Sequence, residues 1–114
     1  MFLKHIEVDV RPGRRARYRA AQAVWNREMA SAPGFLGTFC GTERGADAAV
    51  HVFVLWESRH AYEEWMASDH DRIADLAGAD SHFVEATVRL LDETLAPPPV
   101  LRVTGPGVDR TLSW

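Results

Sequence analysis

Residues 50–76 constrain the fold more than any other part of the sequence. They overlap an apolar segment, Ala49–Trp56, in which His51 is the one polar interior residue, as expected of a central strand covered on both faces. Ser58 follows as a good helix N-cap, and apolar side chains then recur at helical spacing: Ala61, Tyr62, Trp65, Met66, Ile73 and Leu76. The stretch predicts a buried strand that runs straight into a helix, with a kink or a second helix start at Ser68-Asp69.

The remaining segments predict three more strands and one more helix. Residues 2–10 are predicted to form a strand, because Ile6, Val8 and Val10 alternate with His5, Glu7 and Asp9 in the period of two that a strand with unlike faces requires. Residues 14–30 repeat their larger apolar side chains near helical spacing. Residues 35–42 and 83–91 are predicted strands, the polar segment 43–48 a hairpin loop, and the glycines at 37 and 41 suggest a bulge or a close backbone approach.

The predicted order is β-α-β-β-α-β, which defines an α+β fold of the ferredoxin-like type. Its four-stranded antiparallel sheet carries both helices on one face. The other face must meet either solvent or a second sheet. On the predicted strand parity, this second face carries His5, Glu7, Asp9, Glu85, Thr87 and Arg89.

Composition and length indicate one domain, residues 1–95, followed by a tail, residues 96–114, that is either mobile or a dimer arm. A single cysteine, Cys40, excludes an intrachain disulfide, and charges within the first ten residues argue against a signal peptide. No apolar run approaches the roughly 18–20 residues of a membrane span. We therefore expect a cytoplasmic protein that does not enter the membrane. A net charge of −3 with interleaved acids and bases argues against nucleic acid as a partner.

Three short motifs carry a resemblance to a known superfamily. They are Val10-x-Pro12-Gly13, Gly34-Phe35-Leu36-Gly37, and Trp56-Glu57-Ser58 followed by Ala61-Tyr62 and Trp65. Over residues 2 to 94 the chain resembles the dimeric α+β barrel superfamily. Within it the chain is similar to the antibiotic-biosynthesis-monooxygenase-like proteins, and most closely to the uncharacterised YdbC-like group. The resemblance implies a homodimer through facing sheets and a cleft between sheet and helices in each subunit.

The resemblance implies two kinds of enzyme. Cofactor-independent monooxygenases of this type oxidise polycyclic aromatic phenols, and Trp56 matches their strand-three tryptophan. Haem-degrading relatives use a strand-one asparagine, a helical tryptophan and a histidine ligand. Trp65 matches the helical tryptophan, but Ile6 or Glu7 replaces the asparagine and Asp75 the ligand. A carboxylate is a poor haem ligand, so haem binding would require the nearest histidine, His70.

The leading hypothesis is a metal-free and cofactor-free oxygenase that encloses a small hydrophobic or aromatic molecule between the sheet and the second helix. In it His70 takes the proton of a phenol, so that an electron-rich anion can react with dioxygen. The predicted ligand-binding residues are Trp25, Trp56, Tyr62, Trp65 and Met66.

A competing hypothesis is a non-catalytic ligand-binding or stress-associated dimer, whose cleft is filled by its own side chains. The tryptophans would then be ordinary core residues, because aromatic side chains bury large areas. A haem-binding or haem-degrading protein is the third alternative. His5 and His51 could share one sheet face, where we expect hydrogen-bonded structural groups. Without a third nearby ligand they make an incomplete zinc site.

Overall fold

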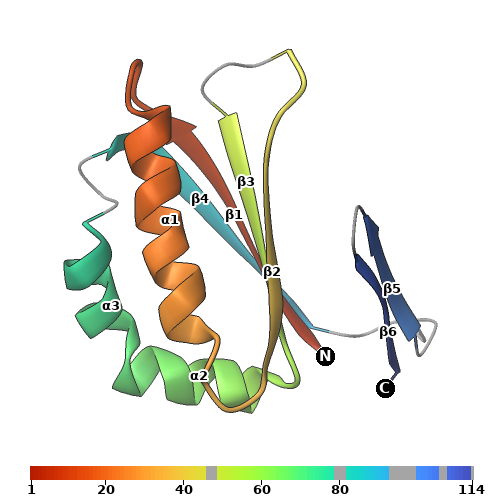
Figure 1. Ribbon diagram of the computed structural model, residues 1–114. Coiled ribbons are helices and arrows are strands. Elements are labelled where there is room, and N and C mark those ends of the chain that lie inside the picture. The colour runs from red at the N-terminus through yellow and green to blue at the C-terminus, as the bar shows by residue number, and fades with distance from the viewer. Residues whose placement is uncertain (46–48, 79–81, 93–99, 106–107, 114) are drawn as a thin grey trace.

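The computed structural model describes residues 1–45, 49–78 and 82–92, and the backbone course of 100–105 and 108–113. Along the chain the elements are β1 (Phe2–Val10), α1 (Arg15–Met29), β2 (Phe35–Thr42), β3 (Ala49–Trp56), α2 (Arg59–Ser68), α3 (His70–Ala77), β4 (Phe83–Asp92), β5 (Val100–Gly105) and β6 (Val108–Ser113). The first four strands form one antiparallel sheet in the order β2-β3-β1-β4, with the helices on one of its faces (Figure 1). The predicted ferredoxin-like α+β fold is confirmed.

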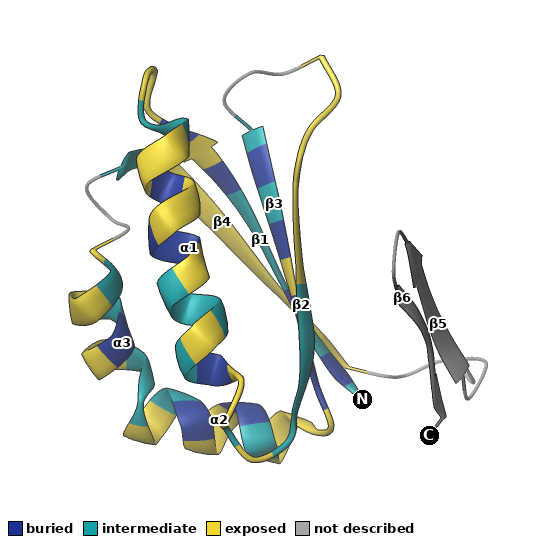
Figure 2. Cartoon of the chain, in the orientation of Figure 1, coloured by how far each residue is buried: buried dark blue, intermediate teal, exposed yellow. Residues whose placement is uncertain are grey.

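The hydrophobic core lies between the sheet and the helices. In Figure 2 the buried positions alternate along β1 and β3 and form a stripe along α1, because side chains alternate across a strand and recur every three or four residues along a helix. The buried apolar cluster contains Phe2, Val8, Val10, Tyr18, Ala21, Met29, Val50, Val52, Val54, Trp56, Tyr62, Trp65 and Ile73. Within the described ranges, no helix combines the length and apolar character that a membrane span requires.

The second predicted helix consists of two shorter ones, α2 and α3, which meet at Asp69. The Ser58 hydroxyl caps α2 as predicted, since Ser58 Oγ accepts a hydrogen bond from the Ala61 N–H at 3.1 Å. At the other end of α2, Ser68 Oγ donates to the Glu64 carbonyl at 2.9 Å, a side-chain bond that competes with helical pairing. Asp69 leaves the helical region with φ −125 and ψ −23, so the predicted break at Ser68-Asp69 is confirmed.

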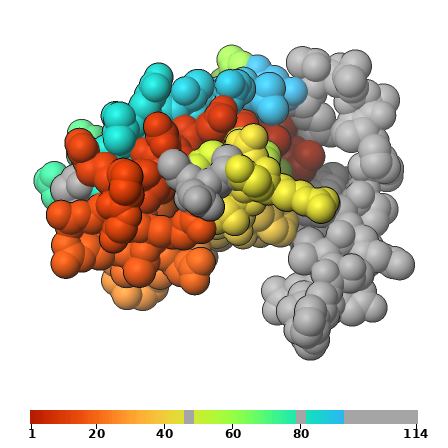
Figure 3. Space-filling model, turned by 90° about the horizontal axis from the view of Figure 1, so that it is seen from above, coloured from red at the N-terminus to blue at the C-terminus, as the bar shows by residue number. Residues whose placement is uncertain are grey.

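β4 forms an outer edge of the sheet and carries exposed side chains along most of its length. Figure 3, viewed from above, shows β4 and α1 on opposite sides of the molecule. Val84 is 61% exposed and Leu90 50% exposed, because the helices reach only part of this strand. The apolar positions of β4 are therefore less deeply buried than the sequence alternation alone would indicate.

The sheet face opposite the helices, which we call the open face, is free of helices. The strand register aligns Glu7 with His51 and Thr87, and His5 with Phe53 and Arg89, so these side chains share one face as the predicted parity requires. The open face also carries large apolar side chains that are at least partly exposed: Phe39 at 41%, Phe53 at 36% and Leu91 at 50%.

The predicted tail contains two strands that the sequence analysis did not identify. β5 and β6 pair antiparallel as a separate two-stranded sheet, from Val100 opposite Ser113 to Gly105 opposite Val108. The proposed boundary between residues 95 and 96 lies outside the described residues. A role of the tail as a dimer arm stays a prediction.

Gly34 immediately precedes β2 and packs against the first turn of α2. It has φ +82, and a Cβ added there would lie 2.5 Å from Ala61 Cβ. The Glu57 N–H also donates to the Gly34 carbonyl at 2.7 Å. Only glycine combines the left-handed conformation with so close a contact, which explains the glycine of the Gly34-Phe35-Leu36-Gly37 motif.

We expect Gly34→Ala to lower the free energy of unfolding by about 2 kcal/mol, from backbone strain and overpacking together. Gly13→Ala is the matched control, because Gly13 has φ +74 but a Cβ added there would meet no atom within 4 Å, so only strain should remain. Urea unfolding of both variants measures the difference. Equal losses would contradict a tight approach to Ala61.

Candidate functional site

A cavity of about 180 Å³ lies between the sheet and the helices. Aliphatic side chains of the sheet, among them Ile6, Val52 and Val88, form one wall. Aromatic rings from α1, β3 and the α2–α3 junction form the other side: Trp25, Trp56, Trp65 and His70. The interior is therefore not filled by the protein's own side chains.

The aromatic side chains contact one another around this cavity. Ring centroids lie 5.3 Å apart for Trp56 and Trp65, 5.9 Å for Trp25 and Trp65, 5.2 Å for Trp25 and His70, and 5.5 Å for Trp65 and His70. Such separations are typical of packed aromatic pairs. Four of the residues singled out from the sequence, three tryptophans and one histidine, thus line one cavity.

Tyr62 and Met66, also predicted to bind ligand, are not among the lining residues. The Tyr62 ring lies 5.0 Å from Phe2 and 6.1 Å from Trp56, and Met66 packs on the core cluster. Helical spacing correctly predicted that both side chains face inward. It cannot distinguish an inward side chain that packs against the core from one that lines a cavity. Their predicted role in ligand binding has no support from this geometry.

His70 is the first residue of α3 and lies at the edge of the cavity. Its Nδ1 is 3.0 Å from Asp71 Oδ1, and its side chain remains 28% exposed. A carboxylate partner at Nδ1 favours the tautomer with Nε2 unprotonated and able to accept a proton. His70 therefore touches the cavity wall and has a route to solvent. Asp75 is exposed and does not line the cavity.

Lys4 is the residue of this site that the sequence analysis missed. Its side chain lines the cavity and is only 8% exposed. The ammonium lies 5.4 Å from the centre of the Tyr62 ring, and among the described residues it has neither a hydrogen bond nor an ion pair. Burial lowers the pKa of Lys4 below its ordinary value. The signal was present in the sequence, since Lys4 has the same strand parity as Phe2, Ile6 and Val8.

Most of the unsatisfied polar groups around the cavity are hydrogen-bond donors. The indole N–H groups of Trp56 and Trp65 are buried and find no partner in the described part of the chain. Gln22, only 7% exposed, uses its amide N–H to donate to Asn26 Oδ1 at 2.9 Å. Burial raises the pKa of Tyr18 to about 12, with Cys40 contributing, so its hydroxyl stays protonated at neutral pH. Lys4 is thus the residue that brings a cationic donor to the wall of the cavity.

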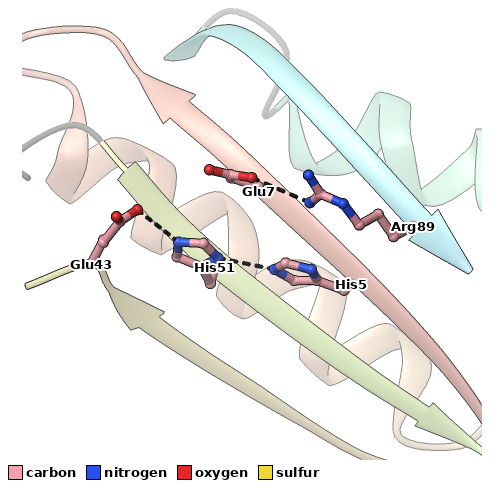
Figure 4. A network of polar contacts seen from close by, with 5 residues as sticks. All are labelled: His5, Glu7, Glu43, His51 and Arg89. Atoms are coloured by element: carbon pink, nitrogen blue, oxygen red, sulfur yellow. Dashed lines mark hydrogen bonds and ion pairs between the residues drawn. The ribbon is translucent and has the colours of Figure 1, made fainter. Parts of the chain in front are cut away.

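A second polar cluster lies on the open face (Figure 4). His5 Nε2 is 2.9 Å from His51 Nδ1, His51 Nε2 is 3.1 Å from Glu43 Oε2, and Arg89 donates to Glu7 at 3.2 Å. Desolvation, with help from His51 and Arg89, lowers the pKa of His5. Three of the side chains thus form one hydrogen-bonded chain, His5–His51–Glu43, and Glu7 and Arg89 form a separate ion pair on the same face.

This cluster also places side chains that could bind a metal ion close to His51, which the sequence alone did not predict. Ligand atoms of Glu7, Glu43 and His51 lie within 4.8 Å of one another. Each of these three side chains, however, already has a partner within the cluster. The cluster fits the predicted structural role of the two histidines, and hydrogen bonds within the chain account for its geometry.

Comparison with known proteins supplies a family but no function. The family model described as "Domain of unknown function (DUF4937)" matches residues 2–91 of the 114-residue chain. No curated protein matches the sequence significantly. The nearer resemblance to the YdbC-like group stays a prediction.

Solved structures share the fold at low sequence identity. A variant of SnoaB, a cofactor-independent oxygenase from Streptomyces nogalater, matches with a TM-score of 0.72 at 15% identity, over 85% of this chain and 96% of the other. A candidate antibiotic biosynthesis monooxygenase from Bordetella bronchiseptica matches with a TM-score of 0.66 at 22% identity, over 82% of this chain and 98% of the other. A candidate antibiotic biosynthesis monooxygenase from Deinococcus radiodurans matches with a TM-score of 0.70 at 11% identity, over 92% of this chain and 100% of the other. The resemblance to antibiotic-biosynthesis-monooxygenase-like proteins is confirmed at the level of fold.

Proposed function

The chain belongs to the DUF4937 family of unknown function, and from that premise we propose that it binds a small aromatic molecule in its cavity and oxidises it with dioxygen. One observation carries the proposal. Trp25, Trp56 and Trp65 line a cavity together with His70. Apolar walls with a few convergent polar groups are the usual form of a small-molecule site. The cavity differs from the filled cleft that the competing hypothesis predicts, but a cavity alone does not separate an enzyme from a protein that only binds a ligand.

The volume of the cavity limits its ligand. A cavity of about 150 Å³ is enough for benzene, whereas sites for drug-sized molecules measure roughly 300–1,000 Å³. The 180 Å³ present here therefore suits a single substituted ring. A polycyclic phenol or a haem would extend beyond this volume. The haem alternative is further weakened because Asp75 is outside the cavity wall and Glu7 belongs to the open face.

In the proposed reaction His70 acts as the base. The O–H bond of a bound phenol breaks, its electron pair stays on the oxygen, and the proton moves to His70 Nε2. The phenolate then reduces dioxygen. One oxygen atom enters the ring to give a quinone and the other leaves as water. Dioxygen is the sole oxidant, and the step needs no external reductant, metal or cofactor. His70 can return its proton to solvent through its exposed edge.

The fold neighbour SnoaB supports this chemistry by analogy, because it is named a cofactor-independent oxygenase. The analogy is limited by 15% identity and by the many chemistries that one fold can host. The argument for this chain therefore depends on its own cavity residues. A non-catalytic binding protein would use the same cavity, and the next experiment separates the two.

We expect His70→Ala to lower the rate of dioxygen consumption with a one-ring phenol or hydroquinone by about 10²–10⁴-fold, the usual contribution of a positioned base. His60→Ala is the matched control, since the His60 side chain is 79% exposed on α2 and pairs with Glu64. An oxygen electrode measures both. Unchanged turnover in His70→Ala would disprove its role. Binding without turnover in the unmodified protein would identify a non-catalytic binding protein.

The protein is also proposed to associate with a second copy through the open face. Exposed Phe39, Phe53 and Leu91 provide apolar area there, and the same face carries acids as well as the base Arg89. A twofold contact brings such a face against itself, so that opposite charges can pair. Two sheets would then enclose a common interior, with the helices outside.

A further inference from the structure

We propose that the cavity selects the anionic form of its ligand, a one-ring phenolate whose negative oxygen binds to the Lys4 ammonium. This inference rests on the proposed function, because it requires that a small aromatic molecule enters the cavity. The inference adds two points to the proposed function: the charge state of the ligand, and Lys4 as the residue that determines this charge state. It also gives a role to Lys4, a residue that the proposed base chemistry of His70 does not use.

The first argument is the burial of Lys4 without an anionic partner. Taking an ammonium group even partly out of water costs free energy, and buried cations are therefore normally paired. Lys4 is 8% exposed, and no carboxylate of the described residues pairs with it. Its contact with the Tyr62 ring, at 5.4 Å, is worth roughly 0.5–2 kcal/mol and offsets only part of that cost. A bound anion would supply the missing partner.

The second argument is the position of Lys4 in the sheet. Lys4 pairs with Val54 on the sheet face that also carries Ile6 and Val52, and all four side chains line the cavity. An ammonium makes its strongest hydrogen bonds to a charged acceptor. A phenolate oxygen is such an acceptor, and a neutral hydroxyl is a weaker one.

The walls of the cavity disfavour inorganic anions. Trp25, Trp56 and Trp65 with the aliphatic side chains of the sheet make the cavity largely apolar, which disfavours a phosphate or another strongly hydrated ion. The single positive charge of Lys4 suits one negative charge. An anion with an aromatic ring satisfies both parts of the cavity, the ring against the tryptophans and the oxygen against Lys4. Lys4 thus lowers the free energy of the bound phenolate.

The test uses 4-nitrophenol, whose phenolate absorbs visible light and whose pKa in water lies near neutrality. We titrate the absorbance of the bound probe against pH. We expect the pKa of the bound probe to fall by at least about one unit, equivalent to a tenfold preference for the phenolate. Lys4→Met should remove this shift and weaken phenolate binding about tenfold or more. Lys4→Arg keeps the positive charge and should retain most of the shift.

The outcomes separate this inference from the proposed function. If 4-nitrophenol binds with an unchanged or raised pKa, or if Lys4→Met keeps the shift, anion selection by Lys4 is wrong while an aromatic cavity stands. If neither form of the probe binds to the unmodified protein, both proposals fail. Lys4→Met removes a buried charge, so we expect it to fold, and circular dichroism with thermal unfolding checks this.

Discussion

Replacing Trp56 with alanine should lower the free energy of unfolding by about 3–5 kcal/mol, the usual cost of emptying a large aromatic site in a core. Trp56 is 0% exposed and is the largest fully buried side chain. Its ring lies 5.3 Å from Trp65, 5.7 Å from Phe35 and 6.1 Å from Tyr62. Trp56 therefore joins the end of β3 to α2 and to the beginning of β2, and its removal disturbs all three.

The loss is large relative to the total stability of a small domain, which is about 5–15 kcal/mol. Trp25→Ala provides the comparison, because Trp25 lines the same cavity but is only partly buried on α1. We expect it to cost clearly less. Chemical denaturation of both variants measures the difference. A Trp56 variant as stable as the Trp25 variant would contradict the central position assigned to Trp56.

Trp56→Ala should also change the size of the ligand that the cavity accepts. Removing the indole side chain enlarges a cavity of about 180 Å³, so two-ring phenols should gain affinity over one-ring phenols. A folded variant with unchanged size preference would mean that Trp56 does not bound the ligand. The free energy of unfolding tests the role of Trp56 in the core, and the preferred ligand size tests its role in the cavity wall. The two measurements are independent.

The strands of the four-stranded sheet could be predicted from the sequence because the pattern that defines each of them is local. The period of two in β1 and the apolar run of β3 depend only on neighbouring residues and on which face is buried. Ser58 and the Ser68-Asp69 break are likewise local, since a capping or competing hydroxyl acts within one turn of the helix. β1, β2 and β3 consequently have the predicted bounds, Phe2–Val10, Phe35–Thr42 and Ala49–Trp56.

The parts that could not be predicted depend on contacts between distant segments. Glu43 approaches His51 only because β2 and β3 pair in one particular register. A cavity is the space that packing leaves between elements, so helical spacing could not exclude Tyr62 and Met66 from its lining. Lys4 is a different case. The strand pattern already places Lys4 on the inward face of β1. Long cationic side chains usually reach solvent, however, and the burial of Lys4 follows only from the packing of the folded chain.

Phe53→Asp should convert a dimer of this protein into a monomer. Phe53 lies in the middle of β3, is 36% exposed on the open face, and stacks on His5 with ring centroids 4.6 Å apart. In the proposed dimer, that ring is covered by the second copy. A carboxylate in its place would lose its water shell on association, and its neighbours within the subunit are the imidazoles of His5 and His51. We expect the dissociation constant to rise at least about 100-fold, because removing a charge from water costs several kcal/mol.

The isolated subunit should tolerate the same change, since Phe53 already meets solvent and does not line the cavity. The variant is thus expected to fold, to remain monomeric in sedimentation experiments and still to bind 4-nitrophenol. Leu76→Asp is the matched control, because Leu76 is 57% exposed on α3, away from the open face. It should leave the dimer intact. A monomeric unmodified protein, or a Phe53→Asp variant that stays dimeric, would show that the open face is not where two copies meet.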